Sequence, residues 1–322
     1  TLAKVALAAG VSKTTAASVL SGRKKMSAQT TTRVLQAAQS LGYRGDPKAS
    51  GLSRGTAPTL GVLYSGYVSE MIFRRSSLFW PRFNEGLVQR CSQEGVVVAF
   101  ASEAQAQALI NSGADAILVL GSFSQEVFDA LHIPFGMPVI SRDPIPGQPL
   151  VIGQHDPIAI AEAVVTHLAE QGCTHVGWLL GPGAEQIFGQ WQSALAAAAQ
   201  SVDVAFSAHV HDGSESAVTA AVRALTEAGV NGIFSALTDT GQLRRELGIG
   251  GLSAQPEVLL VVQAEGIVEE AMSPSVSTLS LMSFESGEVV AGMCLSIIAS
   301  RATQPSSLPF ELTVRDSSRR HR

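Results

Sequence analysis

From residue 59 onward, short apolar runs of the β type alternate with amphipathic stretches of helical period, and this alternation constrains the fold most. Buried strands separated by helices predict a parallel sheet, because each crossover connection places a helix on a face of the sheet. The apolar runs are 60–64, 96–101, 116–120, 175–180, 204–209, 232–236, 258–262 and 308–314. The helical stretches are 79–94, 104–111, 126–131, 158–171, 185–200, 215–227 and 283–300.

The alternation occurs in two sets, which predicts two α/β lobes. The late segments 283–300 and 308–314 are expected to cross back between the lobes. A ligand is expected in the cleft at the carboxyl ends of the strands. A chain of 322 residues, 46% of them hydrophobic, can bury the core that such a protein needs.

Composition excludes several classes of protein. The apolar runs are broken by Gly, Asp or Ser and are far shorter than the roughly 20 residues that span a bilayer, so no membrane segment is predicted. Cys91, Cys173 and Cys294 are odd in number and widely separated, and the N-terminus lacks the pattern of a secretory signal. We therefore expect a cytoplasmic protein with reduced thiols, neither disordered nor a coiled coil.

The net charge of −5 conceals a strong asymmetry along the chain. Residues 1–58 contain nine Lys and Arg residues and one acid, Asp46, and carry a charge of +8, whereas residues 59–322 carry −13. A basic head on an acidic body is typical of a nucleic-acid-binding module joined to a domain that does not bind nucleic acid. The alternative is a solvated basic surface.

The first 45 residues predict three short helices around one small core. Thr1, Ser12 and Ser27 are the predicted N-caps, and Gly10 and Gly22 end the first two helices. The apolar stripes are Leu2, Val5, Ala6 and Ala9, then Ala16, Val19 and Leu20, then Val34, Leu35, Ala38 and Leu41.

The tight turn 9–12 joins the first two helices as in a helix-turn-helix, whose second helix enters the DNA major groove. Hydroxyl and basic side chains near the start of that helix can contact base edges and phosphates, and a basic loop can hold the backbone. The predicted DNA-binding residues are Ser12, Lys13, Thr14, Thr15 and Ser18 on the helix and Arg23, Lys24 and Lys25 on the loop. A plain helical bundle, the alternative, leaves these residues without a role.

Several motifs of this head resemble the DNA-binding head of the LacI/GalR family of bacterial transcription regulators, in order and spacing. They are Thr1-Leu2-Ala3-Lys4-Val5-Ala6, Ala9-Gly10-Val11-Ser12, Val19-Leu20-Ser21-Gly22, Thr32-Arg33-Val34 and Leu41-Gly42-Tyr43-Arg44. The family usually has Val-Ser-Arg or a similar triplet where this chain has Ala16-Ala17-Ser18, which implies an atypical operator.

Residues 46–58 have chain breakers at both ends and are predicted to form a linker. In the family the equivalent segment is a hinge helix that folds on the operator, and the resemblance implies that Leu52 enters the minor groove as a wedge. Lys48 and Arg54 are the accompanying basic contacts. A flexible tether is the alternative. The predicted division is thus 1–45 for the head, 46–58 for the linker and 59–322 for the body.

The body resembles the LacI/GalR core more loosely, over nearly its whole length. The matching motifs are Phe79-Trp80, His167-Leu168 with Gly172, Ser277-Thr278-Leu279, Glu285-Ser286-Gly287 and Val314-Arg315-Asp316-Ser317. The resemblance implies a body of the periplasmic-binding-protein type, two parallel-sheet α/β lobes that bind an effector and form a homodimer.

The implied effector site is only partly that of the family, because Pro144, Pro157 and Ile187 replace polar residues that the family has. A sugar site needs aromatic faces for stacking and several hydrogen-bonding groups for hydroxyls. The effector-binding residues predicted here are Phe79, Trp80, Asp143, Asp156, Asp239 and Glu265. Phe79 and Trp80 have packing in the core as their alternative, and the effector is a sugar, a smaller or more apolar metabolite, or absent.

No motif supports catalysis, a cofactor or a resident metal. Neither a dinucleotide-binding glycine motif nor a phosphate-binding loop occurs, and Gly181-Pro182-Gly183 is an isolated turn. His209 and His211 lie two residues apart but lack a third ligand, so no metal site is predicted.

The sequence therefore predicts a dimeric transcription regulator, a repressor, that binds double-stranded operator DNA and responds to a small-molecule effector, with a sugar as one candidate. A solute-binding protein of the transport type is the second hypothesis, which the basic head and the missing signal disfavour. An α/β enzyme is the third, and it lacks a catalytic constellation.

Overall fold

The computed structural model describes residues 1–20, 26–41, 43, 57–74, 78–134, 137–142, 152–182, 184–249, 258–299 and 306–320. The chain divides into two compact units. Unit 1 comprises Thr1–Ser69, Leu87–Ile152 and Val290–Pro305, and unit 2 comprises Glu70–Gly86, Gly153–Val289 and Ser306–Arg322. Among the described residues, no helix combines the length and the apolar character that crossing a membrane requires.

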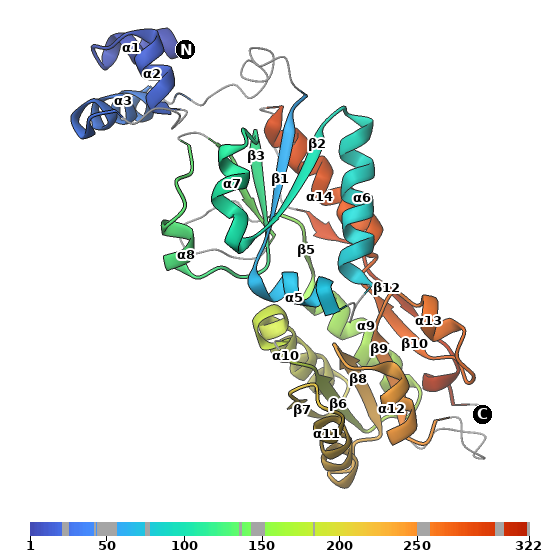
Figure 1. Cartoon of the computed structure of the whole chain (residues 1–322). Helices are drawn as coiled ribbons and strands as arrows, with labels where there is room; N and C mark the ends of the chain where they lie inside the picture. Colours follow the sequence, from blue (N-terminus) through green and yellow to red (C-terminus); the bar gives the residue numbers. More distant parts are fainter. Residues whose placement is uncertain are drawn as a thin grey trace. The chain divides into compact units, whose positions relative to one another are not determined.

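The N-terminal part of unit 1 is a head of three helices, α1 (Leu2–Ala8), α2 (Lys13–Leu20) and α3 (Ala28–Ser40), as predicted (Figure 1). Each helix begins at a hydroxyl residue that accepts a backbone N–H three residues on, over 3.5 Å at Thr1, 3.0 Å at Ser12 and 3.3 Å at Ser27. The three helices share one core, which consists of Val5, Ala6, Ala9, Ala16, Leu20, Val34, Ala37 and Ala38.

The rest of unit 1 is built on a four-stranded parallel sheet in the order β2-β1-β3-β4. The strands are β1 (Thr59–Tyr64), β2 (Val97–Ser102), β3 (Ala116–Leu120) and β4 (Val139–Ser141). One face packs against the 3₁₀ turn η1 (Glu103–Gln105) and the helices α7 (Ala106–Asn111) and α8 (Gln125–Asp129). Every residue of β3 is buried, as expected for a central strand of a parallel sheet.

Unit 2 contains a six-stranded sheet in the order β12-β10-β9-β8-β6-β7, in which only β12 is antiparallel to its neighbour. The strands are β6 (His175–Leu180), β7 (Ala205–Val210), β8 (Gly232–Ala236), β9 (Leu259–Gln263), β10 (Ser277–Ser280) and β12 (Glu311–Thr313). A separate short pair joins β5 (Gln154–His155) to β11 (Ser307–Leu308). Because β6 connects to β7 on one side and pairs with β8 on the other, the carboxyl ends of β6 and β8 form the usual ligand-binding point of such a sheet.

Helices cover both faces of the unit 2 sheet, as Figure 1 shows. On one face α11 (Glu215–Glu227) and α12 (Thr240–Glu246) pack against Leu179, Ile233 and Leu260. On the other face lie α9 (Pro157–Glu170) and α10 (Ala184–Ser201), where Trp191 stacks on Phe234 with ring centroids 6.5 Å apart. The short helix α13 (Ile267–Glu270) follows β9.

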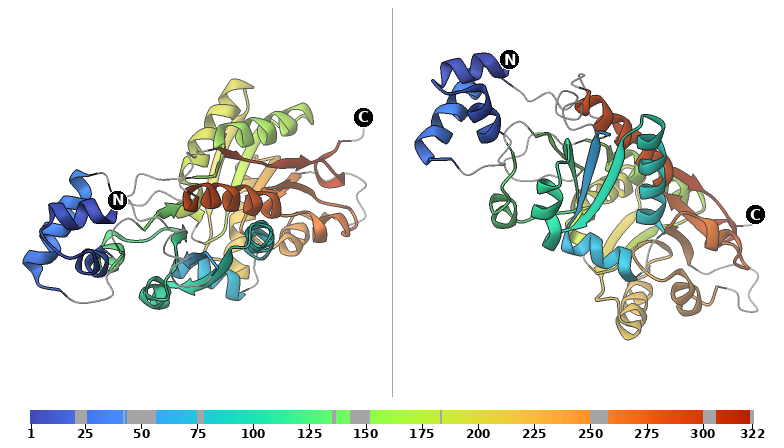
Figure 2. Two further views of the ribbon diagram at one scale, coloured as in Figure 1. Left: turned by 90° about the horizontal axis from the view of Figure 1, so that it is seen from above. Right: turned by 45° about the horizontal axis from the view of Figure 1, so that its top comes forward.

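Three helices contain residues of both units: α5 (Gly66–Arg74), α6 (Phe79–Gln93) and α14 (Ser283–Ile298). Both views in Figure 2 place α6 beside α14. The two helices meet at Gly86, where the carbonyl oxygen of Phe284 occupies the position that a Cβ atom would need.

Most of the predicted elements are observed, with two kinds of difference. The predicted strand 308–314 is instead two strands, β11 and β12, separated at Pro309, which lacks the N–H that a continuous ladder requires. Several elements were not predicted, because they are short or lack a clear period: α5, α12, α13, β4, β5 and β10. The observed fold confirms an α/β chain with a three-helix head and a body of two sheet-containing units.

The contact at Gly86 generates a test of the packing between α6 and α14. Alanine normally stabilises a helix by about 0.5–1 kcal/mol relative to glycine. We expect Gly86→Ala to lower the free energy of unfolding by several kcal/mol, because a rigid backbone carbonyl must move. The matched control is Gly189→Ala in α10, where nothing lies within 4 Å of the added methyl group. Urea denaturation measures both, and equal stabilities of the two variants would contradict the packing described.

Candidate nucleic-acid interface and ligand pocket

The head presents the start of α2 to solvent. Lys13 and Thr14 are exposed, while Ala16 and Leu20 on the opposite face are buried in the core of the head. The helix is short and is held by its two neighbours, so these side chains lie on a rigid support. An exposed helix start with one base and one hydroxyl can contact both phosphates and base edges.

Two of the predicted contact residues also have a structural task. The Ser12 hydroxyl accepts the Thr15 N–H over 3.0 Å and lies 2.8 Å from the Thr15 hydroxyl. Ser12 is therefore the N-cap of α2, and Thr15 is the residue that it caps. Ser18 is half-buried. Thr14 is the most accessible of the predicted hydroxyl residues on this helix.

Several predicted site residues lie outside the described residues. They are Arg23, Lys24 and Lys25 of the basic loop, Lys48, Leu52 and Arg54 of the linker, and Asp143 of the body. Their predicted roles stay predictions.

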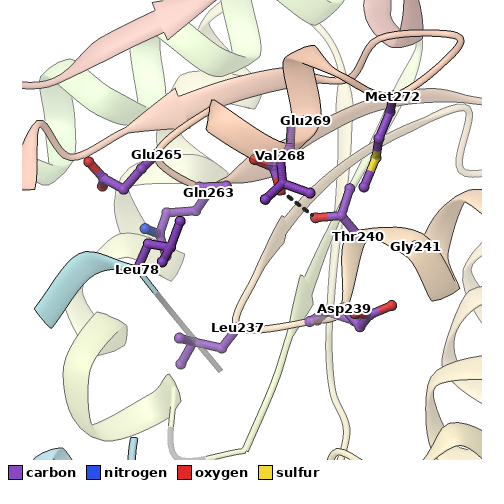
Figure 3. A pocket seen from close by; sticks show the side chains of 12 residues that line it. Leu78, Leu237, Asp239, Thr240, Gly241, Gln263, Glu265, Val268, Glu269 and Met272 are labelled. Atoms are coloured by element: carbon purple, nitrogen blue, oxygen red, sulfur yellow. Dashed lines mark hydrogen bonds between the residues drawn. The ribbon is translucent and has the colours of Figure 1, made fainter. Parts of the chain in front are cut away.

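Unit 2 contains a pocket of about 240 Å³ beyond the carboxyl ends of β8 and β9 (Figure 3). A pocket at the carboxyl ends of parallel strands is where a sheet of this kind can hold a ligand. The described residues that line it are Leu78, Leu237, Thr238, Asp239, Thr240, Gly241, Gln263, Ala264, Glu265, Val268, Glu269 and Met272. Three of these side chains are carboxylates and none is a lysine or an arginine, so the pocket presents mainly hydrogen-bond acceptors.

Asp239 and Glu265, both predicted, are brought together in this pocket. Asp239 is exposed and its carboxylate accepts the Gln242 N–H over 2.6 Å, which makes it the N-cap of α12. One Glu265 oxygen, Oε2, accepts from the Ser283 hydroxyl at 2.7 Å and from the Ser283 N–H at 3.1 Å. The other, Oε1, is buried and has no partner among the described residues.

Glu269 is a third pocket carboxylate that the sequence analysis missed. Its side chain is 8% exposed, and the Thr240 hydroxyl donates to its Oε1 over 3.1 Å (Figure 3). Glu269 lies on a helix of only four residues, and Glu265 and Glu270 are acids close to it in the sequence. So short a helix shows no hydrophobic period, and the sequence therefore does not indicate which of these carboxylates is buried. The one sequence feature that could have indicated a role for Glu269 is its position four residues after the predicted site residue Glu265.

The structure corrects the prediction that Phe79 and Trp80 offer open faces to a ligand. Phe79 is 6% and Trp80 is 5% exposed. Their rings meet edge to face with centroids 5.0 Å apart, and both contact Phe83. The two aromatic residues belong to the core at the start of α6, because this end of the helix buries its apolar face.

Asp156 does not line the pocket described. It is exposed at the N-terminus of α9, where its Oδ1 accepts the N–H groups of Ile158 at 2.9 Å and Ala159 at 3.3 Å. Pro157 at the first helical position completes a standard helix start. The polar residue expected to contact an effector thus serves as an N-cap.

A buried histidine lies behind the pocket. His211 follows β7 and bonds through Nε2 to the hydroxyl of Thr238, one of the pocket residues, over 2.8 Å. Burial lowers the pKa of His211 below its usual range, partly offset by the carboxylate of Asp212. Within the part of the chain that the structure describes, no group of three or more His, Cys, Asp or Glu residues could hold a metal ion.

Comparison with known proteins extends the analysis of the head. The family model for bacterial regulatory proteins of the lacI family matches residues 1–46. The HTH-type transcriptional regulator AscG of Escherichia coli (strain K12) is 42% identical over 84 residues, 24% of this chain. The chain spans about a quarter of the length of AscG in this match.

Two further comparisons cover nearly the whole chain. The ribose operon repressor of Halalkalibacterium halodurans is 24% identical over 337 residues, 99% of this chain and 97% of the repressor. The lac repressor dimer bound to operator and the anti-inducer ONPF has the same fold, with a TM-score of 0.69 and 17% identity over 99% of each chain. The head therefore matches the lacI family over residues 1–46, and the whole chain is similar in sequence to a ribose operon repressor and shares the fold of the lac repressor.

Proposed function

We propose that this protein is a sequence-specific DNA-binding transcription regulator, a repressor, whose affinity for its operator depends on a neutral, hydroxyl-rich effector in the unit 2 pocket. The observation that carries the proposal is the exposed start of α2 on a head whose sequence matches the lacI family. No catalytic step is part of the proposal. The linker 46–58 transmits the effect of the ligand, with Leu52 as a minor-groove wedge.

Two copies of the chain act together in this proposal. One head offers little contact area, and two heads on a dimer reach half-sites about one DNA turn apart, roughly 10 bp. Unit 1 supports a dimer, because the edge strand β2 carries the exposed apolar side chains Val97 and Phe100, at 52% and 41% exposure. An exposed apolar edge strand is a favourable surface for association with another chain.

The chemistry of the pocket supports a neutral effector. Asp239, Glu265 and Glu269 can accept hydrogen bonds from hydroxyl groups, and Leu237 and Met272 provide apolar contact. A phosphate or carboxylate on the ligand would meet like charges with no cation among the described lining residues to compensate. A sugar is the class of metabolite that best fits these acceptors, and the ribose operon repressor is a relative whose name refers to a sugar.

The first test of the proposal separates base recognition from backbone contact on α2. We expect Thr14→Ala to change the preferred base at one position, since a good base contact discriminates by about 1–3 kcal/mol. Lys13→Ala should weaken binding to all sequences and reduce the slope of log affinity against log salt by about 0.9. Selection of binding sites from a random DNA library, followed by titrations at several salt concentrations, measures both.

The matched control for Thr14→Ala is Thr32→Ala, an exposed threonine on α3. It should leave the selected sequence unchanged. Identical selected sequences for wild type and Thr14→Ala would contradict recognition through this part of α2.

The second test concerns the charge of the effector. D-Ribose, D-glucose, maltose and cellobiose are compared with glucose 6-phosphate and gluconate by thermal shift, and we expect stabilisation only by neutral sugars. For a sugar that binds, Glu269→Gln should reduce affinity about tenfold or more, because hydrogen bonds to a charged group contribute about 1.5–3 kcal/mol. Glu270→Gln, an exposed neighbour, is the control. Preferential binding of the anionic sugars would refute the proposed class.

The third test separates the two tasks of Asp239. Asp239→Ala removes both the cap of α12 and a pocket carboxylate, so it should lower the free energy of unfolding by about 1 kcal/mol and weaken effector binding. Asp239→Ser retains a capping hydroxyl, so we expect near-normal stability with the same loss of effector affinity. Both variants should bind operator normally without effector. Full effector response in Asp239→Ser would show that this side chain only caps the helix.

A further inference from the structure

His211 stands where the carboxyl ends of three strands of unit 2 meet. Its backbone N–H donates to the carbonyl of Leu180 at the end of β6 over 2.9 Å, and Gly181 donates to Ala236 at the end of β8 over 2.9 Å. The His211 side chain is 5% exposed. The ring therefore lies inside the edge of the sheet at which the pocket forms.

The hydrogen bonds of the ring determine its tautomer. The N–H of Gly213 donates to Nδ1 over 3.1 Å, so Nδ1 carries no proton in the neutral ring. The proton is on Nε2, which donates to the Thr238 hydroxyl oxygen over 2.8 Å. The Thr238 hydroxyl proton then points elsewhere, and the Ala236 carbonyl at 3.4 Å is a long and weak partner for it.

The backbone next to Thr238 is strained, and the hydrogen bond from His211 helps to hold it in place. Leu237 adopts a left-handed conformation with φ +58°, which is unfavourable for a side chain of this size. Leu237, Thr238 and Asp239 all line the pocket. The bond from His211 ties this segment to the turn that follows β7, so the ring restricts how the segment can relax.

We propose that His211 is a positioning residue of the pocket, whose neutral ring holds Thr238 at the pocket wall and whose protonation at Nδ1 displaces it. A protonated Nδ1 can no longer accept from Gly213, because two N–H groups would then face each other. The protonated ring keeps its Nε2–H donor to Thr238 but loses the bond from Gly213, so the turn 211–214 rearranges and the ring carries Thr238 with it. The pocket is consequently complete at neutral pH and loosens as the ring gains a proton.

The charges around the ring decide where this change occurs. Asp212 and His209 neighbour it on its own segment, and Asp239 follows Thr238 on the facing segment. Asp212 favours the protonated ring and His209 opposes it, while burial favours the neutral ring most strongly. Because the pKa of His211 is lowered, the ring stays neutral as the pH falls through the usual value near 6.5, and the anchor shifts only at lower pH.

The test observes the pocket without any ligand, so it does not depend on the proposed effector. Full-length protein labelled with ¹⁵N-threonine and ¹⁵N-histidine is titrated by NMR between about pH 8 and pH 5. In the wild type we expect the Thr238 amide signal and the His211 ring signal to shift with one common midpoint below 6.5. Thr226, whose hydroxyl donates to the backbone carbonyls of Val222 and Arg223, should stay constant.

Two variants distinguish positioning from simple filling of space. His211→Gln keeps an amide donor close to the position of Nε2 and does not titrate, so the Thr238 signal should stay near its neutral position at every pH. His211→Phe fills the space without a donor, so the Thr238 signal should be displaced at every pH while circular dichroism reports a folded chain. A Thr238 signal that titrates in His211→Gln as in the wild type, or that ignores the titration of the His211 ring, overturns the proposal.

A second measurement connects the anchor to binding and rests on the proposed function. The sugar with the largest thermal shift among D-ribose, D-glucose, maltose and cellobiose is titrated at about pH 5 and about pH 7.5. Wild-type affinity should fall about five- to tenfold at the lower pH, as expected if the displaced Thr238 makes one hydrogen bond fewer to the sugar, and His211→Gln should show no such fall. If no sugar binds, the proposed effector class fails and the NMR result alone decides the role of His211. Equal pH dependence in both proteins overturns the link between the anchor and binding.

Discussion

The close approach of two backbones at the carboxyl ends of β6 and β8 is the constraint on which the pocket of unit 2 depends. Gly181 donates to the carbonyl of Ala236, and no side chain fits at Gly181 because the Leu237 carbonyl occupies that space. The chain leaves β8 through the left-handed Leu237 and then enters α12. Thr238, Asp239 and Thr240 thereby reach the pocket from one short segment.

Helix N-caps account for several polar residues that also carry the function proposed here. Ser12 caps the helix that presents Lys13 and Thr14, and Asp239 caps α12 while it lines the pocket. A carboxylate has two oxygens and about four acceptor positions, so one side chain can hold a backbone N–H and still accept from a ligand. Stability and binding are coupled at such residues, and only substitutions that keep the cap can separate them.

The sheets and their covering helices were predictable because hydrophobic period is a local property. The runs 116–120, 175–180 and 232–236 coincide with β3, β6 and β8, since buried parallel strands are apolar on both faces. The caps Thr1 and Ser27 were predictable for a similar reason, because an N-cap contacts N–H groups only two or three residues away. Short elements such as α13 have too few residues to show any period.

The sequence by itself determined the three-helix head, the two α/β sets and two of the pocket acids, Asp239 and Glu265. Tertiary structure decided which polar and aromatic residues face the pocket. Phe79 and Trp80 are core residues, and Glu269 is a pocket residue, because exposure depends on what packs against each side chain from distant parts of the chain. Likewise, 27 residues separate His211 from Thr238, and only the strand order places their side chains in contact. A local sequence pattern does not show which residues from distant parts of the chain become neighbours, so the geometry of the pocket depends on the fold.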